Sequence, residues 1–369
     1  MNRLATVALS PLGGLYGVAM KVRRGFYRRG WLRVREVGAP VISVGNITLG
    51  GTGKTPLVEW VATKLAAENR QVCILTRGYG RLHPRQRVVV SNGSEILSDA
   101  AHAGDEALLL AERLKGHAAV ISDADRVSAA RWAIKHLGSG VFILDDGFQN
   151  LGLARNLNIV AVDATNPWGN RQLIPAGILR EPLSQLSRAD CIVLTRIEDS
   201  DQIEKLEGEM SQLTKSPIFH SRTKIRSLRP INVAGENLSS EEVMSSRVAA
   251  FCGIGNPKSF FAQLQGDGYE LVYTQIFRDH HAYDQSNIDR VVRESIAAGA
   301  QALLTTAKDE VKLRSLRFDP PCYAVDITIE IAEEGQFGTL IKESLRNKSK
   351  SEAGHKGSVR SPASESSAG

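Results

Sequence analysis

A glycine-rich turn separates an apolar tetrapeptide from a helix-like segment in VISVGNITLGGTGKTPLVEW, residues 41–60. Residues 55–68 predict a helix, because Pro56 is tolerated in a first turn and Leu57, Val61 and Leu65 repeat every four residues. A strand, a turn and a helix N-terminus in this order gather backbone N–H groups and the positive end of a helix dipole around one point. The stretch therefore predicts a phosphate-binding loop inside a β-loop-α unit.

The loop predicts nucleotide binding, with a plain glycine-rich turn as the alternative. The first glycine of the GxxxxGK[ST] pattern falls at Thr48, but the later glycines still give the backbone the freedom it needs. In that pattern the lysine, here Lys54, reaches the β and γ phosphates, and the next hydroxyl, here Thr55, ligates Mg²⁺. The predicted nucleotide-binding residues are Thr48, Leu49, Gly50, Gly51, Thr52, Gly53, Lys54 and Thr55.

Apolar, β-rich runs alternate with helix-like segments along most of the chain. Strands that are apolar throughout and alternate with helices predict a doubly wound α/β domain with a mostly parallel sheet, assigned to residues 36–225. A second, smaller α/β domain is predicted at 226–346, after an extended connector, and a disordered tail rich in Ser, Gly and Lys at 347–369. In the second domain, VAAFCGIGNPKSFFAQL, residues 248–264, predicts a strand, a glycine turn and a helix. The other predicted strands are residues 41–44, 72–76, 88–90, 120–122, 141–144, 159–162 and 192–194, then 302–305 and 323–325.

Two neighbouring acids follow one of these strands in VFILDDGFQN, residues 141–150. Asp145 and Asp146 would repel each other unless a cation lay near them, and nucleotide sites often hold Mg²⁺ through an acid at the end of a second strand. We therefore predict that both acids bind magnesium. The alternative is that they cap the turn that follows.

Two further loops contain residues suited to proton transfer. GDEALLLAERL places Asp105 ahead of a helical repeat, where it could equally cap the helix. FRDHHAYD, residues 277–284, places His280 beside aromatic residues in the second domain. A histidine has a pKa near neutrality and can take a proton from an attacking hydroxyl, with a carboxylate to orient it. Chemistry in the cleft between the two domains is the expectation.

The net charge of +6 is concentrated at the N-terminus. Residues 1–35 contain eight basic residues and no acid, and removing them leaves 38 basic and 40 acidic residues. The uncharged run 4–20 would be ~25 Å long as a helix, short for a bilayer crossing, and its cations follow the run, unlike those of an export signal. We predict a basic amphipathic helix on an anionic membrane surface, with an ordinary capping helix as the alternative. Nothing here indicates nucleic acid.

Eight motifs in order resemble the tetraacyldisaccharide 4'-kinase family of lipid A biosynthesis. The similarity runs from the N-terminal segment to about residue 340. A non-glycine residue at the position of Thr48 is normal in that family. The motifs are GNITLGGTGKTP, RGYGR at 77–81, GDE at 104–106, DDGFQ at 145–149, GN at 169–170, LIPAGILREP at 173–182, FCGIGNPKSFF and FRDHHAYD.

This resemblance implies transfer of the γ phosphate of ATP, with Mg²⁺, to the 4'-hydroxyl of an acylated glucosamine disaccharide 1-phosphate, forming lipid IV A. It places the enzyme at the cytoplasmic face of the bacterial inner membrane, held by a monotopic N-terminal helix. We infer no protein partner from the sequence. Lys54 would bind phosphates, Thr55, Asp145 and Asp146 would surround Mg²⁺, and Asp105 with His280 would form a catalytic dyad. Four motif residues are candidates for substrate contacts or structural ion pairs: Arg77, Tyr79, Asn170 and Arg180.

Three other functions share some of these features. A membrane-associated ATPase switch of the partitioning type would carry a second lysine ahead of the paired glycines, where Leu49 stands. A GTPase chaperone would need an NKxD motif, which the strand DCIVLTRIED does not supply. A kinase of a small soluble sugar would have no use for residues 1–35. The switch is the closest alternative.

Overall fold

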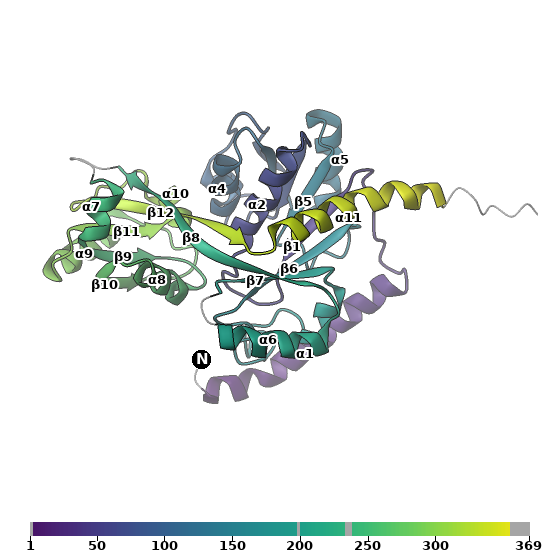
Figure 1. Ribbon diagram of the computed structural model, residues 1–369, viewed down its shortest axis with the longest axis horizontal. Helices are drawn as coiled ribbons and strands as arrows, with labels where there is room; N and C mark the ends of the chain where they lie inside the picture. The colour runs from purple at the N-terminus through teal and green to yellow at the C-terminus, as the bar shows by residue number, and fades with distance from the viewer. Residues whose placement is uncertain (1–2, 198–199, 233–237, 355–369) are drawn as a thin grey trace, which may run out of the picture.

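The computed structural model describes residues 3–197, 200–232 and 238–354, and its strands form one mixed sheet of twelve (Figure 1). The order across the sheet is β10-β9-β11-β12-β8-β7-β6-β1-β5-β2-β4-β3. The strands of the N-terminal half are β1 (Val41–Gly45), β2 (Val72–Thr76), β3 (Val88–Ser91), β4 (Ala118–Ser122), β5 (Val141–Asp145), β6 (Leu157–Asp163) and β7 (Cys191–Thr195). All seven strands predicted before residue 225 are therefore confirmed.

The N-terminal half is doubly wound around β1. Strand β1 pairs in parallel with β5 on one side and β6 on the other, so the chain order reverses there. Ligands of such sheets bind at the carboxyl ends of the strands beside a reversal. The helices of this half are α1 (Arg3–Arg28), α2 (Lys54–Ala66), α3 (Ala100–Ala103), α4 (Asp105–Arg113), α5 (Arg126–Leu137), the 3₁₀ helix η1 (Leu183–Arg188) and α6 (Ser200–Leu213).

Both faces of this sheet are covered, which explains why its strands are apolar throughout. Ile42 and Ile74 point to one face and pack with side chains of α2 and α4. Val41 and Leu75 point to the opposite face and pack against α5. Because successive side chains of a strand alternate between faces, an uninterrupted apolar run can satisfy two helical layers at once.

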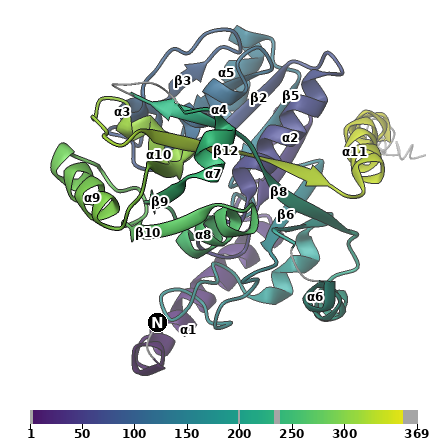
Figure 2. The same cartoon turned by 60° about the vertical axis from the view of Figure 1, so that its left-hand side comes forward.

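The C-terminal half contributes β9, β10 and β11 as a parallel set, joined to the rest through β12 and β8 (Figure 2). Strand β10 was not predicted, because most of its residues are partly or fully exposed at the sheet edge and give no continuous apolar run. The elements are β8 (Ile218–Ile231), α7 (Ser240–Ser245), β9 (Arg247–Cys252), α8 (Pro257–Gly266), β10 (Glu270–Ile276), α9 (Gln285–Ala297), β11 (Ala302–Thr306), α10 (Ala307–Leu313), β12 (Cys322–Ile331) and α11 (Glu334–Gly354).

The predicted connector is strand β8, which runs from one half to the other (Figure 1). Its first residues pair in parallel with β7, and the remainder pairs antiparallel with β12. The boundary predicted at residue 225 falls inside this strand. The local sequence indicates an extended segment with many charged residues. Its pairing with β12, which follows about a hundred residues later, cannot be predicted from local periodicity.

The end of the chain returns to the N-terminal half. Phe337 of α11 is buried and packs on Phe219 and Trp60, with ring centroids 4.8 and 5.3 Å apart. Ile341 joins the same core as α2. The sequence boundaries place this segment in the second domain, whereas its apolar side chains complete the first. Helix α11 continues to Gly354 and so includes residues 347–354 of the predicted tail. Residues 355–369 lie outside the described residues.

Helix α1 lies along the outside of the molecule (Figure 1). A Cβ atom at Gly17 would lie 2.7 Å from Leu173 Cδ1, so the absence of side chains at such positions allows α1 to pack closely on the 173–182 loop. Arg24 forms an ion pair with the buried Glu181. None of the helices in the described part of the chain has both the length and the hydropathy required to cross a membrane.

Candidate functional site

The phosphate-binding loop connects β1 to α2 and is held on both sides. Gly50 and Gly53 have φ of 101° and 74°, left-handed values that glycine adopts without a steric cost. The backbone oxygen of Thr52 accepts a hydrogen bond from Thr195 Oγ1 at 3.1 Å, and its hydroxyl accepts one from Asn46 Nδ2 at 3.0 Å. Helix α2 begins at Lys54, so its N-terminus faces the loop as predicted from sequence.

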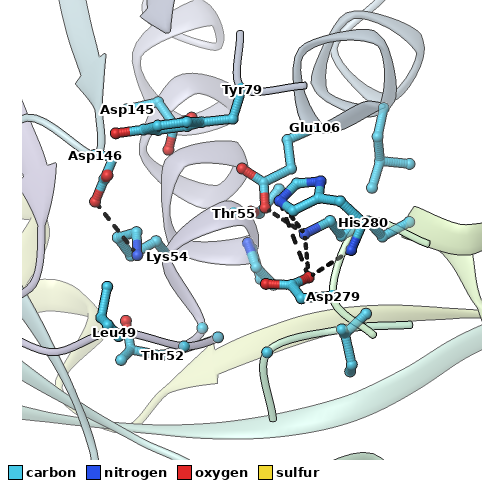
Figure 3. A pocket seen from close by; sticks show the side chains of 18 of the residues that line it. Leu49, Thr52, Lys54, Thr55, Tyr79, Glu106, Asp145, Asp146, Asp279 and His280 are labelled. Atoms are coloured by element: carbon cyan, nitrogen blue, oxygen red, sulfur yellow. Dashed lines mark hydrogen bonds and ion pairs between the residues drawn. The ribbon is translucent and has the colours of Figure 1, made fainter. Parts of the chain in front are cut away.

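A cavity of about 1120 Å³ lies over this loop, and both halves of the chain line it (Figure 3). Residues 49–56 line it from the loop and the start of α2, and Asp145 and Asp146 from the end of β5. The C-terminal half contributes Asp279 and His280. The cavity thus brings the predicted phosphate loop, acid pair and histidine together, as the cleft hypothesis requires.

The two acids after β5 have different surroundings. Asp146 forms an ion pair with Lys54 at 3.4 Å (Figure 3), and both its oxygens accept hydrogen bonds from Arg180 Nη1, at 2.7 and 2.9 Å. Burial would raise the pKa of Asp146, but these cations outweigh it and lower the pKa. For Asp146, Lys54 and Arg180 therefore compensate the charge repulsion from which a metal ion between the two acids was predicted.

Within the described residues Asp145 forms no ion pair, although the charge of Lys54 acts on it at longer range. Its Oδ2 accepts a hydrogen bond from Thr76 Oγ1 at 2.9 Å, and burial, followed by the charges of Glu106 and Asp146, raises its pKa to about 6. A carboxylate that is costly to ionise in its own pocket fits a site where a cation supplies the missing charge. No group of three or more His, Cys, Asp or Glu in the described ranges has metal-site geometry. Mg²⁺ often uses one carboxylate with phosphates and water, which Asp145 and Thr55 suit.

His280 and Asp105 form the predicted pair, although 175 residues separate them. His280 Nδ1 lies 3.0 Å from Asp105 Oδ2, and His280 adopts φ of 58°, which is uncommon for a residue with a side chain. The hydrogen bond to Asp105 raises the pKa of His280, against the lowering effects of burial and Lys308. Burial would raise the pKa of Asp105, but His280 and nearby lysines lower it to about 2. The carboxylate therefore stays ionised and orients the imidazole.

The four candidate substrate residues do not all reach the cavity. Arg77 and Tyr79 line it, and the Arg77 guanidinium lies 5.4 Å from the centroid of the Tyr79 ring. Arg180 also lines it, engaged with Asp146. Asn170 instead donates from Nδ2 to the backbone oxygen of Ala176 at 2.8 Å, which fixes the 170–177 loop. This contact is structural, and a substrate contact of Asn170 stays a prediction.

Several residues that line the cavity or hold its wall were missed by sequence reasoning. Lys308 lies in the first turn of α10 and contacts Glu106 and His280, but a lone lysine in TTAKDE gives no signal. Arg196 donates to the backbone oxygen of Gly51 at 2.6 Å and pairs with Asp163 at the end of β6. Asn256 Nδ2 donates to Asp163 Oδ2 at 2.9 Å. Asn256 lies in the GIGNPKSFF motif, the signal that could have identified this link between the halves.

The sequence is similar to one protein family along most of its length. The sequence model of the family described as tetraacyldisaccharide-1-P 4'-kinase, LpxK, matches residues 5–346. Tetraacyldisaccharide 4'-kinases of Syntrophotalea carbinolica and Halothermothrix orenii are 39% identical over 340 residues and 37% identical over 323 residues. These alignments cover 92% and 84%, respectively, of this chain and of each relative.

The structural comparison points the same way. The crystal structure of the "apo" form of LpxK from Aquifex aeolicus, in complex with ATP, matches with a TM-score of 0.71 and 30% sequence identity. The match covers 92% of this chain and 99% of that one. The α/β fold with its large, mostly parallel sheet is therefore shared. The chain belongs to the tetraacyldisaccharide-1-phosphate 4'-kinase family.

Proposed function

We propose that this protein is a tetraacyldisaccharide 4'-kinase, which transfers the γ phosphate of ATP to the 4'-hydroxyl of tetraacyldisaccharide 1-phosphate in lipid A biosynthesis. The observation that carries the proposal is the cavity lined by both the phosphate loop and His280, whose Nδ1 contacts Asp105. A phosphate donor and a hydroxyl acceptor need this juxtaposition. Full-length family membership supplies the identity of the acceptor.

The chain's own residues would act mainly by positioning and charge neutralisation, which is what phosphoryl transfer asks of a protein. The loop amides and Lys54 bind the triphosphate, and Asp146 with Arg180 fixes the position of the lysine. When bound at Asp145 and Thr55, Mg²⁺ would neutralise charge on the phosphate oxygens. His280 accepts the proton of the acceptor hydroxyl, and Asp105 holds its ring.

The reaction itself provides the first test. Incubating the purified protein with Mg²⁺, ATP and the acylated disaccharide monophosphate is expected to yield a lipid with one added phosphate on the non-reducing sugar. Mass spectrometry of the lipid and a coupled assay for ADP measure this together. Omitting the lipid is the control, since a partitioning-type ATPase would still release ADP. Acceptor-independent ADP release with unmodified lipid would refute the proposal.

The acyl chains of the acceptor explain the outer face of α1. Moving each methylene into water costs ~0.8 kcal/mol, so the enzyme has to work at the membrane surface. Val7 and Leu15 are 72% and 67% exposed, and Val18 is exposed on the same face of α1. The basic residues that follow suit anionic headgroups. Tyr16 and Arg23 of α1 line the cavity, so a membrane bound there would lie beside the site. We place the protein at the cytoplasmic face of the inner membrane.

Charging the apolar face of α1 tests this placement. The double variant Leu15→Glu, Val18→Glu is expected to lose most of its co-flotation with liposomes that contain anionic lipid, because it removes apolar area and adds repulsion. Leu97→Glu, at an exposed leucine far from α1 in the sequence, is the matched control and should float like the wild type. Equal flotation of all three proteins would mean that α1 is an ordinary surface helix.

A further inference from the structure

Lys308 occupies the side of His280 that faces away from Asp105. Its Nζ lies 3.4 Å from His280 Nε2, while His280 Nδ1 is engaged with Asp105. The same ammonium lies 2.8 Å from Glu106 Oε1 and 3.3 Å from Asp279 Oδ1. Figure 3 shows Glu106, Asp279 and His280 converging on one point of the cavity wall. Three groups from two halves of the chain thus meet at Lys308.

This ammonium is fixed and charged. The side chain is 16% exposed, and its two carboxylate contacts come from α4 and from the loop before α9. Burial alone would lower the pKa of Lys308, but Glu106 and Asp279 outweigh it and raise the pKa. A partly buried lysine whose position is set by two acids can direct its remaining hydrogen-bonding capacity at a third group. That group here is His280 Nε2, the ring nitrogen that does not contact Asp105.

The acceptor hydroxyl has to approach the same nitrogen. With Nδ1 hydrogen bonded to Asp105, only Nε2 of His280 can take a proton from substrate. A hydroxyl that gives its proton to Nε2 lies roughly 2.6–3.2 Å from it. Because Lys308 Nζ already lies at hydrogen-bonding range from Nε2, the reacting oxygen would sit beside the ammonium.

We propose that Lys308 is a further catalytic residue of the kinase, whose ammonium contacts the acceptor oxygen and the incoming γ-phosphoryl group opposite Lys54. The inference rests on the proposed function. In the step, the hydroxyl proton passes to His280 Nε2 and the acceptor oxygen forms a bond to the γ phosphorus. The bond from that phosphorus to the bridging oxygen breaks, and ADP leaves with the electron pair. Lys308 neutralises charge on the attacking side and gains or loses no proton.

The neighbouring Lys312 differs in its contacts. Its Nζ lies 3.6 Å from Asp105 Oδ2, 3.4 Å from the fully buried Asp309, and 5.4 Å from the centroid of the Tyr283 ring. These contacts hold α10 against α4. Lys312 therefore supports the carboxylate of the dyad, whereas Lys308 faces the nitrogen that reacts. The charges around His280 are thus Asp105 and Glu106 from α4, Lys308 and Lys312 from α10, and Asp279 from its own loop.

Lys308→Met, Lys308→Arg and Lys115→Met test the inference in the full-length enzyme with Mg²⁺, ATP and the lipid acceptor. Lys115 is exposed and does not line the cavity, so its variant controls for loss of a lysine. We expect Lys308→Met to lower kcat roughly 10²-fold or more, as loss of one preorganised donor does, with KM for ATP changed less than about threefold. Lys308→Arg should recover part of the loss, and Lys115→Met should match the wild type.

The pH profile separates catalysis from structure. Removing the positive charge raises the proton affinity of His280, so the acid limb of the kcat profile should move to higher pH in Lys308→Met and stay in place in Lys115→Met. Unchanged kcat and profile in a folded Lys308→Met variant would overturn the inference. If that variant melts early, Lys308→Gln replaces it, and a wild-type kcat and acid limb in Lys308→Gln would overturn the inference equally. A wild type that forms no phosphorylated lipid would instead refute the proposed function.

Discussion

Changing Asp145 to asparagine is expected to lower kcat about 10³-fold, since charge stabilisation by a metal is worth several kcal/mol and each 1.36 kcal/mol is tenfold in rate. Asparagine keeps the shape and can still accept the hydrogen bond from Thr76. It removes the negative charge that would hold Mg²⁺ against the phosphates. Steady-state kinetics at saturating ATP and varied Mg²⁺ measure the effect.

The same substitution should leave the fold at least as stable. Folding raises the pKa of Asp145 to about 6. In the absence of a cation, ionising this carboxyl therefore destabilises the folded state once the pH exceeds the pKa of Asp145 in the unfolded chain. Asparagine removes this cost, and the Tm at pH 8 in chelator should not fall. Wild-type kcat in the folded variant would exclude Asp145 from the metal site. A Tm that falls by many degrees would mean that the negative charge of Asp145 is stabilised by neighbouring groups in the folded protein.

Replacing His280 with asparagine is expected to lower kcat by ~10² to 10⁴, the contribution of a general base. Asparagine tolerates the left-handed backbone at this position better than most residues, so the loop should keep its conformation. The hydrogen bond to Asp105 raises the pKa of His280. The wild-type rate should therefore fall with decreasing pH from above the ordinary histidine value, and the variant should lose this limb.

His281→Asn is the matched control, one residue away. His281 Nε2 lies 2.7 Å from Asn287 Oδ1, and its ring stacks on Phe277 at 4.7 Å, so it packs against the C-terminal half and not at the cavity. Its kcat should stay close to that of the wild type. Equal losses in both variants would indicate damage to the loop, and wild-type activity in His280→Asn would remove the base from the mechanism.

Much of the fold could be predicted because its signals are local. Strands buried on both faces produce short apolar runs, and the helix after Gly53 shows a four-residue apolar repeat. The phosphate loop could be located for the same reason, since its glycines and Lys54 lie within residues 50–54. Strand β10 gave no such signal because it lies at an exposed edge. The pairing of β8 with β12 was also not predicted, because two strands about a hundred residues apart leave no local periodicity that links them.

The order of residues along the chain was enough to locate the phosphate loop, the acids that follow β5, the basic N-terminal segment and the family. Which charges meet could be known only from the folded molecule. Folding joins Asp105 to His280, pairs Asp146 with Lys54 and Arg180, leaves Asp145 with Thr76, and places Lys308 at the free nitrogen of the histidine. Motifs form from neighbours along the chain, whereas Coulomb and hydrogen-bond energies depend on distances that only folding sets.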